Sequence, residues 1–509
     1  MLIKVLSAAN IGLETIRIEV EVNVCGGGLP KFHIVGLPSK AVDESRQRVV
    51  TAISNSGVSF PRKRITVNLA PADIPKEGSF YDFPISLGIL SLILGVQLPE
   101  GSLFFGELSL DGSLRHTKGA FLLALFAKEF GYQNLYIPAS TTNEAMAISG
   151  LNVYPVENLK QMVDCLKYGQ KIVPCKPKEE AENLSETEIP FDMSDVIGNE
   201  FAKRAMEIVA SGGHNILMTG PPGAGKTMLA RVLPGIMPRL NENESIEVTK
   251  IYSATGNIPP NGTIISQRPF RSPHHTTSTV GLIGGGSKPQ PGEVSLAHRG
   301  ILFLDEFAEF TSVSLEALRQ PLEDGVVTIS RSKGRMTFPA DFTLVAAMNP
   351  CPCGFLNDPK RKCTCTIHEI GRYKRRISGP MLDRIDLHVI VDPVPVEKFR
   401  QQKHSRIGNP TSSDVLQRVV KARKCQKRRF SRCGIHTNSE MSNKEIFEYS
   451  ALSKPSNDLL LKFMDKFNLS ARAYFRIIRV SRTIADLDGS IAIEEKHVSE
   501  ALQYRVKSM

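Results

Sequence analysis

The sequence lacks tryptophan, a long apolar run and an N-terminal leader pattern. The missing tryptophan by itself excludes no class of protein. The longest apolar run, residues 83–98, is shorter than the ~20 residues that a membrane-spanning helix needs, and Pro84 and Gln97 interrupt it. We expect a buried core helix there and no membrane partner. Residues 1–10 show no charged lead, apolar stretch and cleavage site, so no secretory signal is expected.

Cysteine is also scarce, with nine in 509 residues. Without a secretory signal, these cysteines favour reduced thiols or a metal site over disulfides, and a location in a reducing cytoplasm. Acidic residues are outnumbered by 63 Lys and Arg to 52 Asp and Glu, a net charge of +11. This excess favours a polyanionic partner such as nucleic acid without establishing one.

The length predicts about three domains, and the residue patterns divide the chain accordingly. Alternating strands at residues 15–22 and 64–69 indicate a mixed α/β first domain. A polar, charged stretch indicates a linker, and helical spacing dominates the C-terminal part. The predicted segments are 1–167, the linker 168–189, 190–395 and 396–509.

A glycine-rich segment matches the phosphate-loop pattern G-x-x-x-x-G-K-[ST] at every fixed position. An apolar strand precedes it and a helical pattern follows, so backbone N–H groups and a helix start would surround phosphate oxygens. Lys226 is expected to reach the β- and γ-phosphates of ATP, and Thr227 to ligate Mg²⁺. The full segment is Gly220, Pro221, Pro222, Gly223, Ala224, Gly225, Lys226 and Thr227.

Two further apolar strands end in polar residues. Residues 301–304 lead into Asp305 and Glu306, where Asp305 is placed to hold Mg²⁺ and Glu306 to polarise the attacking water. This acidic pair indicates hydrolysis rather than storage of ATP. Residues 342–348 end at Asn349, which either contacts the γ-phosphate or is a plain strand end.

Two arginines further along the chain are candidates for acting on a neighbouring subunit. Arg384 lies in Leu-Asp-Arg-Ile-Asp-Leu, and Arg472 lies in Ser-Ala-Arg at a predicted helix start. An arginine from another subunit would stabilise charge on the transferred phosphoryl group. Taken alone, an arginine of either kind is more often a surface ion-pair partner.

Residues 323–338 predict a β-hairpin with a glycine-containing turn. Its tip carries Arg331, Lys333 and Arg335, which suit the backbone of single- or double-stranded DNA. A solvated, charged turn is the alternative. Residues 254–288 read as a loop-rich insertion that offers a second pore element, and adjacent His274 and His275 within it are weak metal candidates.

Four cysteines lie within fifteen residues: Cys351, Cys353, Cys363 and Cys365. Four thiolates form a complete tetrahedral set for structural Zn²⁺. The C-x-C spacing is tighter than the commoner C-x₂-C, and His368 is a possible replacement ligand. A cysteine-rich loop without metal is the alternative.

These motifs, in this order, resemble those of AAA+ ATPases. The segments between them resemble the YifB/ComM family of the magnesium-chelatase-like branch; they are residues 212–215, 268–277, 292–300, 376–380 and 482–487. The resemblance implies that Asn349 is sensor 1, Arg384 the arginine finger and Arg472 sensor 2. It also implies a homo-oligomeric ring, a hexamer in the family, with Arg376 as a second candidate at the subunit boundary.

Residues 75–79 and 105–112 resemble the Lon-type peptidase domain, which needs a Ser nucleophile and a Lys base. The pattern puts Phe80 at the serine position and Phe121 at the lysine position, with Ser79 and Lys118 offset. We therefore expect an inactive peptidase fold. The expected fold class is α/β: a Lon-protease-like α+β domain, a P-loop AAA+ α/β domain and a C-terminal helical lid.

Three functions compete. A DNA motor would unwind duplexes or move branch points, and the ComM resemblance implies branch migration of branched DNA during integration of transforming DNA, beside recombination proteins. A magnesium-chelatase motor subunit is less consistent with a Lon-like domain. An ATP-driven protein remodeller would present an aromatic pore loop, whereas this hairpin tip is basic.

Overall fold

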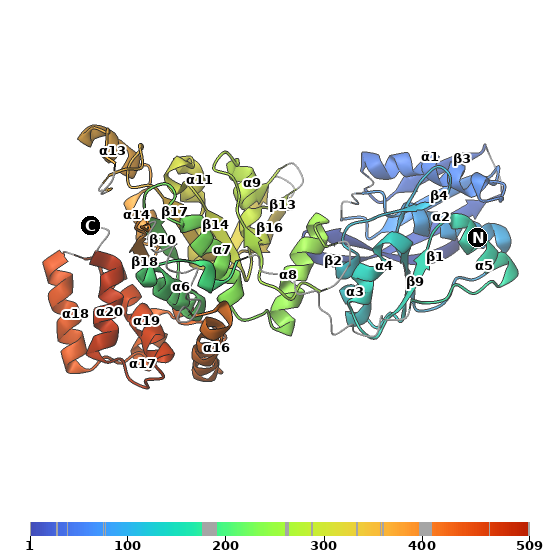
Figure 1. Cartoon of the computed structure of the whole chain (residues 1–509). Coiled ribbons are helices and arrows are strands. Elements are labelled where there is room, and N and C mark those ends of the chain that lie inside the picture. Colours follow the sequence, from blue (N-terminus) through green and yellow to red (C-terminus); the bar gives the residue numbers. More distant parts are fainter. Residues whose placement is uncertain are drawn as a thin grey trace. The chain divides into compact units, whose positions relative to one another are not determined.

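Strands β1 (Leu2–Ile11) and β2 (Glu14–Cys25) open the chain as an antiparallel pair (Figure 1). With β4 (Arg64–Ala70) and β3 (Lys31–Val35) they form a four-stranded sheet in the order β1-β2-β4-β3. Buried residues alternate along β4, which confirms the predicted half-buried strand. Helix α2 (Asp82–Leu94) is buried over its first ten residues, so the apolar run is a core helix as expected.

A second, parallel sheet joins β5 (Ser102–Phe104), β8 (Asn134–Pro138) and β9 (Asn152–Val156). Apolar helix α3 (Ala120–Glu129) supplies much of the core beside it. Three isoleucines from a distant part of the sequence pack against the same core; they are Ile246, Ile258 and Ile264.

The chain divides into two units, each described here by itself. The first comprises residues 1–184 and 245–265, and the second comprises residues 185–244 and 266–509. Residues 245–265, expected within the ATPase domain, therefore belong to the first unit, and helix α8 (Glu242–Thr255) begins just before them. The computed structural model describes residues 2–26, 29–37, 39–74, 76, 78–175, 191–259, 264–286, 289–331, 334–356, 358, 361–395, 410–467 and 469–506. Most of the predicted linker thus lies outside the described residues.

The second unit is built on a five-stranded sheet whose paired strands are all parallel. Its order is β11 (Phe270–Arg271), β14 (Ile301–Leu304), β17 (Thr343–Met348), β10 (Ile216–Thr219) and β18 (Leu387–Ile390). The strands are short, and β14 and β17 are buried throughout, as parallel strands covered on both faces should be. The carboxyl ends of β14, β17 and β10 consequently meet at one edge of the sheet.

Two antiparallel hairpins accompany this sheet. Strands β15 (Val326–Arg331) and β16 (Gly334–Pro339) form the hairpin that the sequence predicts. Strands β12 (Gly284–Gly285) and β13 (Gln290–Pro291) form a second, short one. A Cβ built on Gly284 would lie 3.2 Å from Cδ1 of Ile329, so the short hairpin touches β15.

The C-terminal segment of the second unit is helical, as predicted. Its long helices are α16 (Ser412–Arg429), α18 (Lys454–Phe467), α19 (Ala471–Leu487) and α20 (Glu495–Val506). Helix α19 begins separately from α18, with Ser470 as its N-cap, which accepts a hydrogen bond from the Ala473 N–H. One apolar core spans both this segment and the parallel sheet. Among the helices described, none combines the length and apolar character that crossing a bilayer requires.

Candidate ATPase site

The phosphate loop connects β10 to helix α7 (Lys226–Ile236). Gly223 and Gly225 have φ values of 78° and 94°, a backbone conformation that glycine adopts without strain. Lys226 Nζ donates to the Gly220 and Pro221 carbonyl oxygens at 2.7 and 3.0 Å. Burial lowers the pKa of Lys226, and the nearby charge of Asp305 opposes that shift.

The two acidic residues follow β14 directly, beside the phosphate loop. Thr227 Oγ1 donates to Asp305 Oδ2 at 3.1 Å, and the Glu306 N–H donates to Asp305 Oδ1 at 2.9 Å. Thr227 and Asp305 therefore present adjacent oxygens, the donor set that Mg²⁺ takes beside a nucleotide. Glu306 has a φ of 51°, which is uncommon for a residue with a side chain and turns the chain sharply at the strand end.

Asn349 follows β17, the strand between β14 and β10. Its Oδ1 accepts from Lys226 Nζ at 3.2 Å. A cavity of about 420 Å³ lies between these groups, within the usual range for a small-molecule site. Its walls include all three strand-end residues and most of the phosphate loop: Pro222, Gly223, Ala224, Gly225, Lys226, Thr227, Met228, Asp305, Glu306, Met348 and Asn349.

Arg384 and Arg472 are not among the described residues that line this cavity. Arg384 is buried, forms an ion pair with Glu323 and donates to the Pro380 carbonyl oxygen at 2.7 Å. Burial lowers the pKa of Arg384, and the positive charge of Arg472 adds to the effect. Arg472 is exposed at the start of α19. Both arginines thus lie away from their own chain's phosphate loop, and their roles stay predictions.

The β15–β16 hairpin carries the candidate DNA contacts. Arg335 is exposed on β16, opposite Ser330. Lys333 lies outside the described residues, and Arg331 is described only through its backbone pairing with Gly334. Of the three basic residues, the structure therefore establishes exposure for Arg335.

The four cysteines come together. Their Sγ atoms lie within 4.8 Å of one another, with Cys351 3.4 Å from Cys353 and 3.7 Å from Cys363. Four sulfurs at ~2.3 Å from one zinc ion would be ~3.8 Å apart in a tetrahedron, so this spacing fits the ion. Backbone N–H groups of Phe355 and Thr364 lower the pKa of Cys353 to about 5. His368, the possible replacement ligand, is not part of the cluster that the described residues form.

In the first unit, Phe80 and Phe121 occupy the positions expected for a peptidase nucleophile and base. Both pack into one apolar cluster, where Phe80 stacks on Phe105 at 4.8 Å between ring centroids. The two offset candidates have other partners: Ser79 Oγ donates to Glu107, and Lys118 Nζ donates to the Thr255 carbonyl oxygen at 3.0 Å. These contacts support the expectation of an inactive peptidase fold.

Comparison with known proteins identifies the family of this chain. Family models described as "Magnesium chelatase, subunit ChlI", "Subunit ChlI of Mg-chelatase" and "Magnesium chelatase, subunit ChlI C-terminal" match residues 192–399, 20–141 and 409–505. Competence protein ComM of Haemophilus influenzae is 42% identical over 98% of this chain and 97% of its own length. The chain belongs to the YifB/ComM family.

This family membership agrees with the geometry. The uncharacterized protein YifB of Escherichia coli is 40% identical over 98% of this chain and 96% of its own length. Lon protease 2 of Bacillus subtilis is 27% identical over 195 residues, 34% of this chain and 35% of that protein. The predicted α/β fold class is confirmed, and the YifB/ComM chain is a magnesium-chelatase-like AAA+ ATPase with partial similarity to Lon.

Two residues beside the site escaped the sequence analysis. His275 Nδ1 lies 3.0 Å from Glu306 Oε2, although the sequence suggested only a weak metal role for it. Tyr373, on helix α13 (Ile367–Lys374), is buried, and its hydroxyl lies near the backbone of Asn349, which lowers the pKa of that hydroxyl against the effect of burial. Tyr373 has no motif. His275 lies in the family-like segment 268–277 and just after β11, and a parallel pairing of β11 with β14 would bring it to the catalytic edge.

Proposed function

We propose that this YifB/ComM-family protein is a ring-forming ATPase that moves DNA, by unwinding it or by migrating branched junctions. The observation that carries the proposal is the exposed Arg335 on a hairpin in the same unit as the cavity formed by the phosphate loop, Asp305, Glu306 and Asn349. A basic tip binds phosphates without reading sequence, as a motor must. The excess of positive charge and the name of the Haemophilus relative, a competence protein, also support DNA as the substrate.

The positions of the two arginines support a ring, and the family resemblance implies that the ring is a hexamer. Arg384 and Arg472 lie outside the cavity of their own chain, so a neighbouring subunit would bring its arginine to that cavity. Lys226, Thr227, Asp305, Glu306 and Asn349 would supply one half of each site. Recombination proteins that act on transforming DNA would then contact the ring at the DNA junction.

The first experiment measures ATP hydrolysis with and without single-stranded DNA. We expect DNA to stimulate the parent protein severalfold, and Lys333→Ala combined with Arg335→Ala to abolish that stimulation while the DNA-independent rate remains. Raising the salt concentration should weaken stimulation in the parent. An ATPase rate that DNA leaves unchanged in the parent would contradict the motor.

The narrower activity is tested by three-strand branch migration. Glu306→Gln should bind ATP and DNA but lose migration, because the amide cannot polarise the attacking water. Migration that persists in this variant would remove the role assigned to Glu306. The chelatase alternative predicts instead ATP-dependent Mg²⁺ insertion into a porphyrin with partner subunits, and no strand exchange.

We also propose that the cysteine cluster binds structural Zn²⁺. The spacing of the sulfurs carries this part, since a cysteine loop without metal has no reason to gather four thiols around one point. Bound zinc would hold the loop rigid and keep its thiols as thiolates. One zinc per chain in the purified protein, lost in Cys351→Ser, is the expected result.

A further inference from the structure

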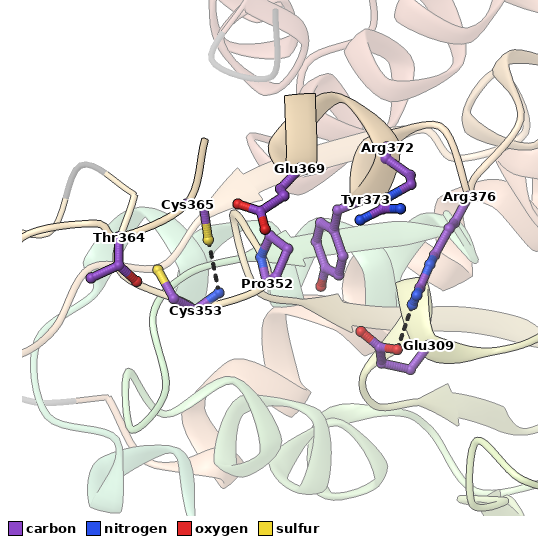
Figure 2. Close-up of a pocket in the computed structure, with 9 residues that line it drawn as sticks. All are labelled: Glu309, Pro352, Cys353, Thr364, Cys365, Glu369, Arg372, Tyr373 and Arg376. Atoms are coloured by element: carbon purple, nitrogen blue, oxygen red, sulfur yellow. Dashed lines mark hydrogen bonds and ion pairs between the residues drawn. The ribbon is translucent and has the colours of Figure 1, made fainter. Parts of the chain in front are cut away.

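The cysteine cluster and helix α13 border a second cavity, of about 690 Å³, distinct from the nucleotide cavity. Cys353 and Cys365 line it together with Tyr373, and the Arg376–Glu309 pair lines it as well (Figure 2). The four cysteines with Gly354, helix α13 and Arg376 just after it are here called the cysteine module, and this module contacts the ATP site at three points. They are the phosphate loop, Asn349 and the segment that follows Glu306.

The first contact is with the phosphate loop. Gly354, between Cys353 and Phe355, has a φ of 84°. A Cβ built on Gly354 would lie 2.7 Å from Cδ and 2.9 Å from Cγ of Pro222. A methyl group does not fit at that distance, so this backbone rests directly on the ring of a phosphate-loop residue.

The second contact is with Asn349. Tyr373 is 5% exposed, and burial raises the pKa of its hydroxyl to about 12, while a hydrogen bond from the Asn349 backbone acts in the opposite direction. The Asn349 side chain in turn accepts from Lys226 Nζ. The buried Tyr373 hydroxyl therefore lies near the backbone of the residue whose side chain faces the lysine of the phosphate loop.

The third contact is with the segment after Glu306. The short helix η3 (Phe307–Glu309) follows Glu306 at once. Arg376 Nη1 lies 2.5 Å from Glu309 Oε2 and 3.3 Å from the Ala308 carbonyl oxygen, as Figure 2 shows for the carboxylate. Through Arg376, the module therefore contacts the segment that directly follows the catalytic residue Glu306.

We propose that the cysteine module positions the ATP site, with Tyr373 and Gly354 as its positioning residues, so that ATP binding and hydrolysis depend on the metal held by the four cysteines. This proposal rests on the proposed zinc site and ATPase activity, but not on DNA movement. When the metal leaves, the four thiols lose their common centre and the three contacts loosen together. Helix and sheet content of the unit is retained, because its apolar core does not include the metal-binding side chains.

The test compares variants of the full chain by hydrolysis without DNA and by binding of a fluorescent ATP analogue. Tyr373→Phe keeps the ring and removes the hydroxyl; we expect kcat to fall about fivefold with KM nearly unchanged and zinc retained, since one hydrogen bond is lost. Gly354→Ala should raise KM about tenfold by displacing Pro222. Gly371→Ala, on α13 with open space at its Cβ, is the matched control and should change neither.

Removal of zinc by a chelator should both lower kcat and weaken ATP binding. We expect the analogue Kd to rise at least tenfold, with the circular dichroism spectrum retained and with recovery when Zn²⁺ is restored. Unchanged analogue binding after complete metal removal would overturn the proposal, as would a Gly354→Ala variant that matches Gly371→Ala. A parent whose ATPase ignores DNA but loses nucleotide on metal removal would refute the motor and leave the module's role standing.

Discussion

The imidazole of His275 contacts the carboxylate of Glu306. Nδ1 of His275 lies 3.0 Å from Oε2 of Glu306, and the imidazole packs edge-on against Phe310 at 6.5 Å between ring centroids. Because a carboxylate only accepts hydrogen bonds, His275 is the donor in this contact. Glu306 borders the nucleotide cavity, whereas His275 is not among the described residues that line it. His275 therefore contacts one oxygen of the Glu306 carboxylate from outside the nucleotide cavity, where the attacking water would be activated.

We expect His275→Ala to raise the DNA-independent rate of ATP hydrolysis about threefold to tenfold, because release of one hydrogen bond of ordinary strength frees Glu306 to face the nucleotide. DNA should then stimulate the variant less than the parent. Steady-state ATPase assays over a range of ATP concentrations would show the change in kcat, with KM nearly constant.

Two further substitutions separate the hydrogen bond from the packing. His275→Asn places an amide Nδ2 at the same number of bonds from the backbone as Nδ1, so it should retain the parent rate. His275→Phe keeps a ring against Phe310 but has no donor, so it should behave like His275→Ala. A slower rate in His275→Ala would mean that His275 assists Glu306 rather than restraining it.

Phe121 is predicted to be structural. The side chain is fully buried at the position where a Lon-type peptidase would have its lysine. Phe121→Ala should cost about 3–5 kcal/mol in the free energy of unfolding of the first unit, measured by urea denaturation. Phe130→Ala, at an exposed aromatic after the same helix, should cost far less. Cleavage of a fluorogenic peptide by the parent that Ser79→Ala abolishes would contradict the inactive assignment.

Asp386 is predicted to make the second unit sensitive to acid. Burial alone would raise its pKa, but the charge of Arg476 and the contact with His214, whose Nδ1 lies 3.4 Å from Oδ2 of Asp386, outweigh burial and hold the pKa well below the ordinary value of 3.8. Since the folded pKa lies below the unfolded one, the unfolded state takes up the proton first as pH falls. The stabilisation is therefore complete above about pH 4 to 5 and is lost progressively at lower pH.

Asp386→Asn should remove this pH dependence and cost about 3–5 kcal/mol at neutral pH, because Arg476 would be left without its buried partner. Thermal unfolding measured at a series of pH values would show both effects. Asp465→Asn, at an exposed residue of α18, is the control and should follow the parent curve. A parent stability that stays constant below pH 4 would contradict the assignment of the depressed pKa.

The sequence alone predicted the residues of the nucleotide cavity that directly follow apolar strands. The phosphate loop, Asp305 and Asn349 each follow an apolar strand, and parallel pairing then brings the strand ends together. The β15–β16 hairpin was also predictable, because its turn and its alternating pattern both lie within residues 323–338.

What the sequence did not reveal depends on tertiary packing. The Tyr373 hydroxyl meets a backbone group more than twenty residues earlier, and the close approach of Gly354 to Pro222 joins two loops that no pattern connects. Residues 245–265 were expected beside the ATPase, yet isoleucines among them pack with the first unit. Apolar side chains show that a segment is buried, but not against which core.

Arg384 is predicted to act on the site of a neighbouring subunit. It is buried against Glu323 and lies outside the cavity of its own chain, so a chain that lacks it keeps an intact phosphate loop. Arg384→Ala alone should lose most ATP hydrolysis while ATP binding remains, since only charge that develops in the transition state is left uncompensated. Lys226→Ala alone should lose ATP binding.

Mixing the two inactive variants distinguishes action in trans from action in cis. In a mixed ring, an Arg384→Ala subunit supplies an intact phosphate loop and a Lys226→Ala neighbour supplies an intact Arg384. We therefore expect hydrolysis by the mixture to exceed the sum of the separate rates severalfold, with a maximum near equal amounts. Size-exclusion chromatography must show that both variants assemble like the parent, because loss of the Glu323 partner can destabilise the fold. A mixture that assembles yet hydrolyses no faster than its parts would place Arg384 outside the neighbour's site.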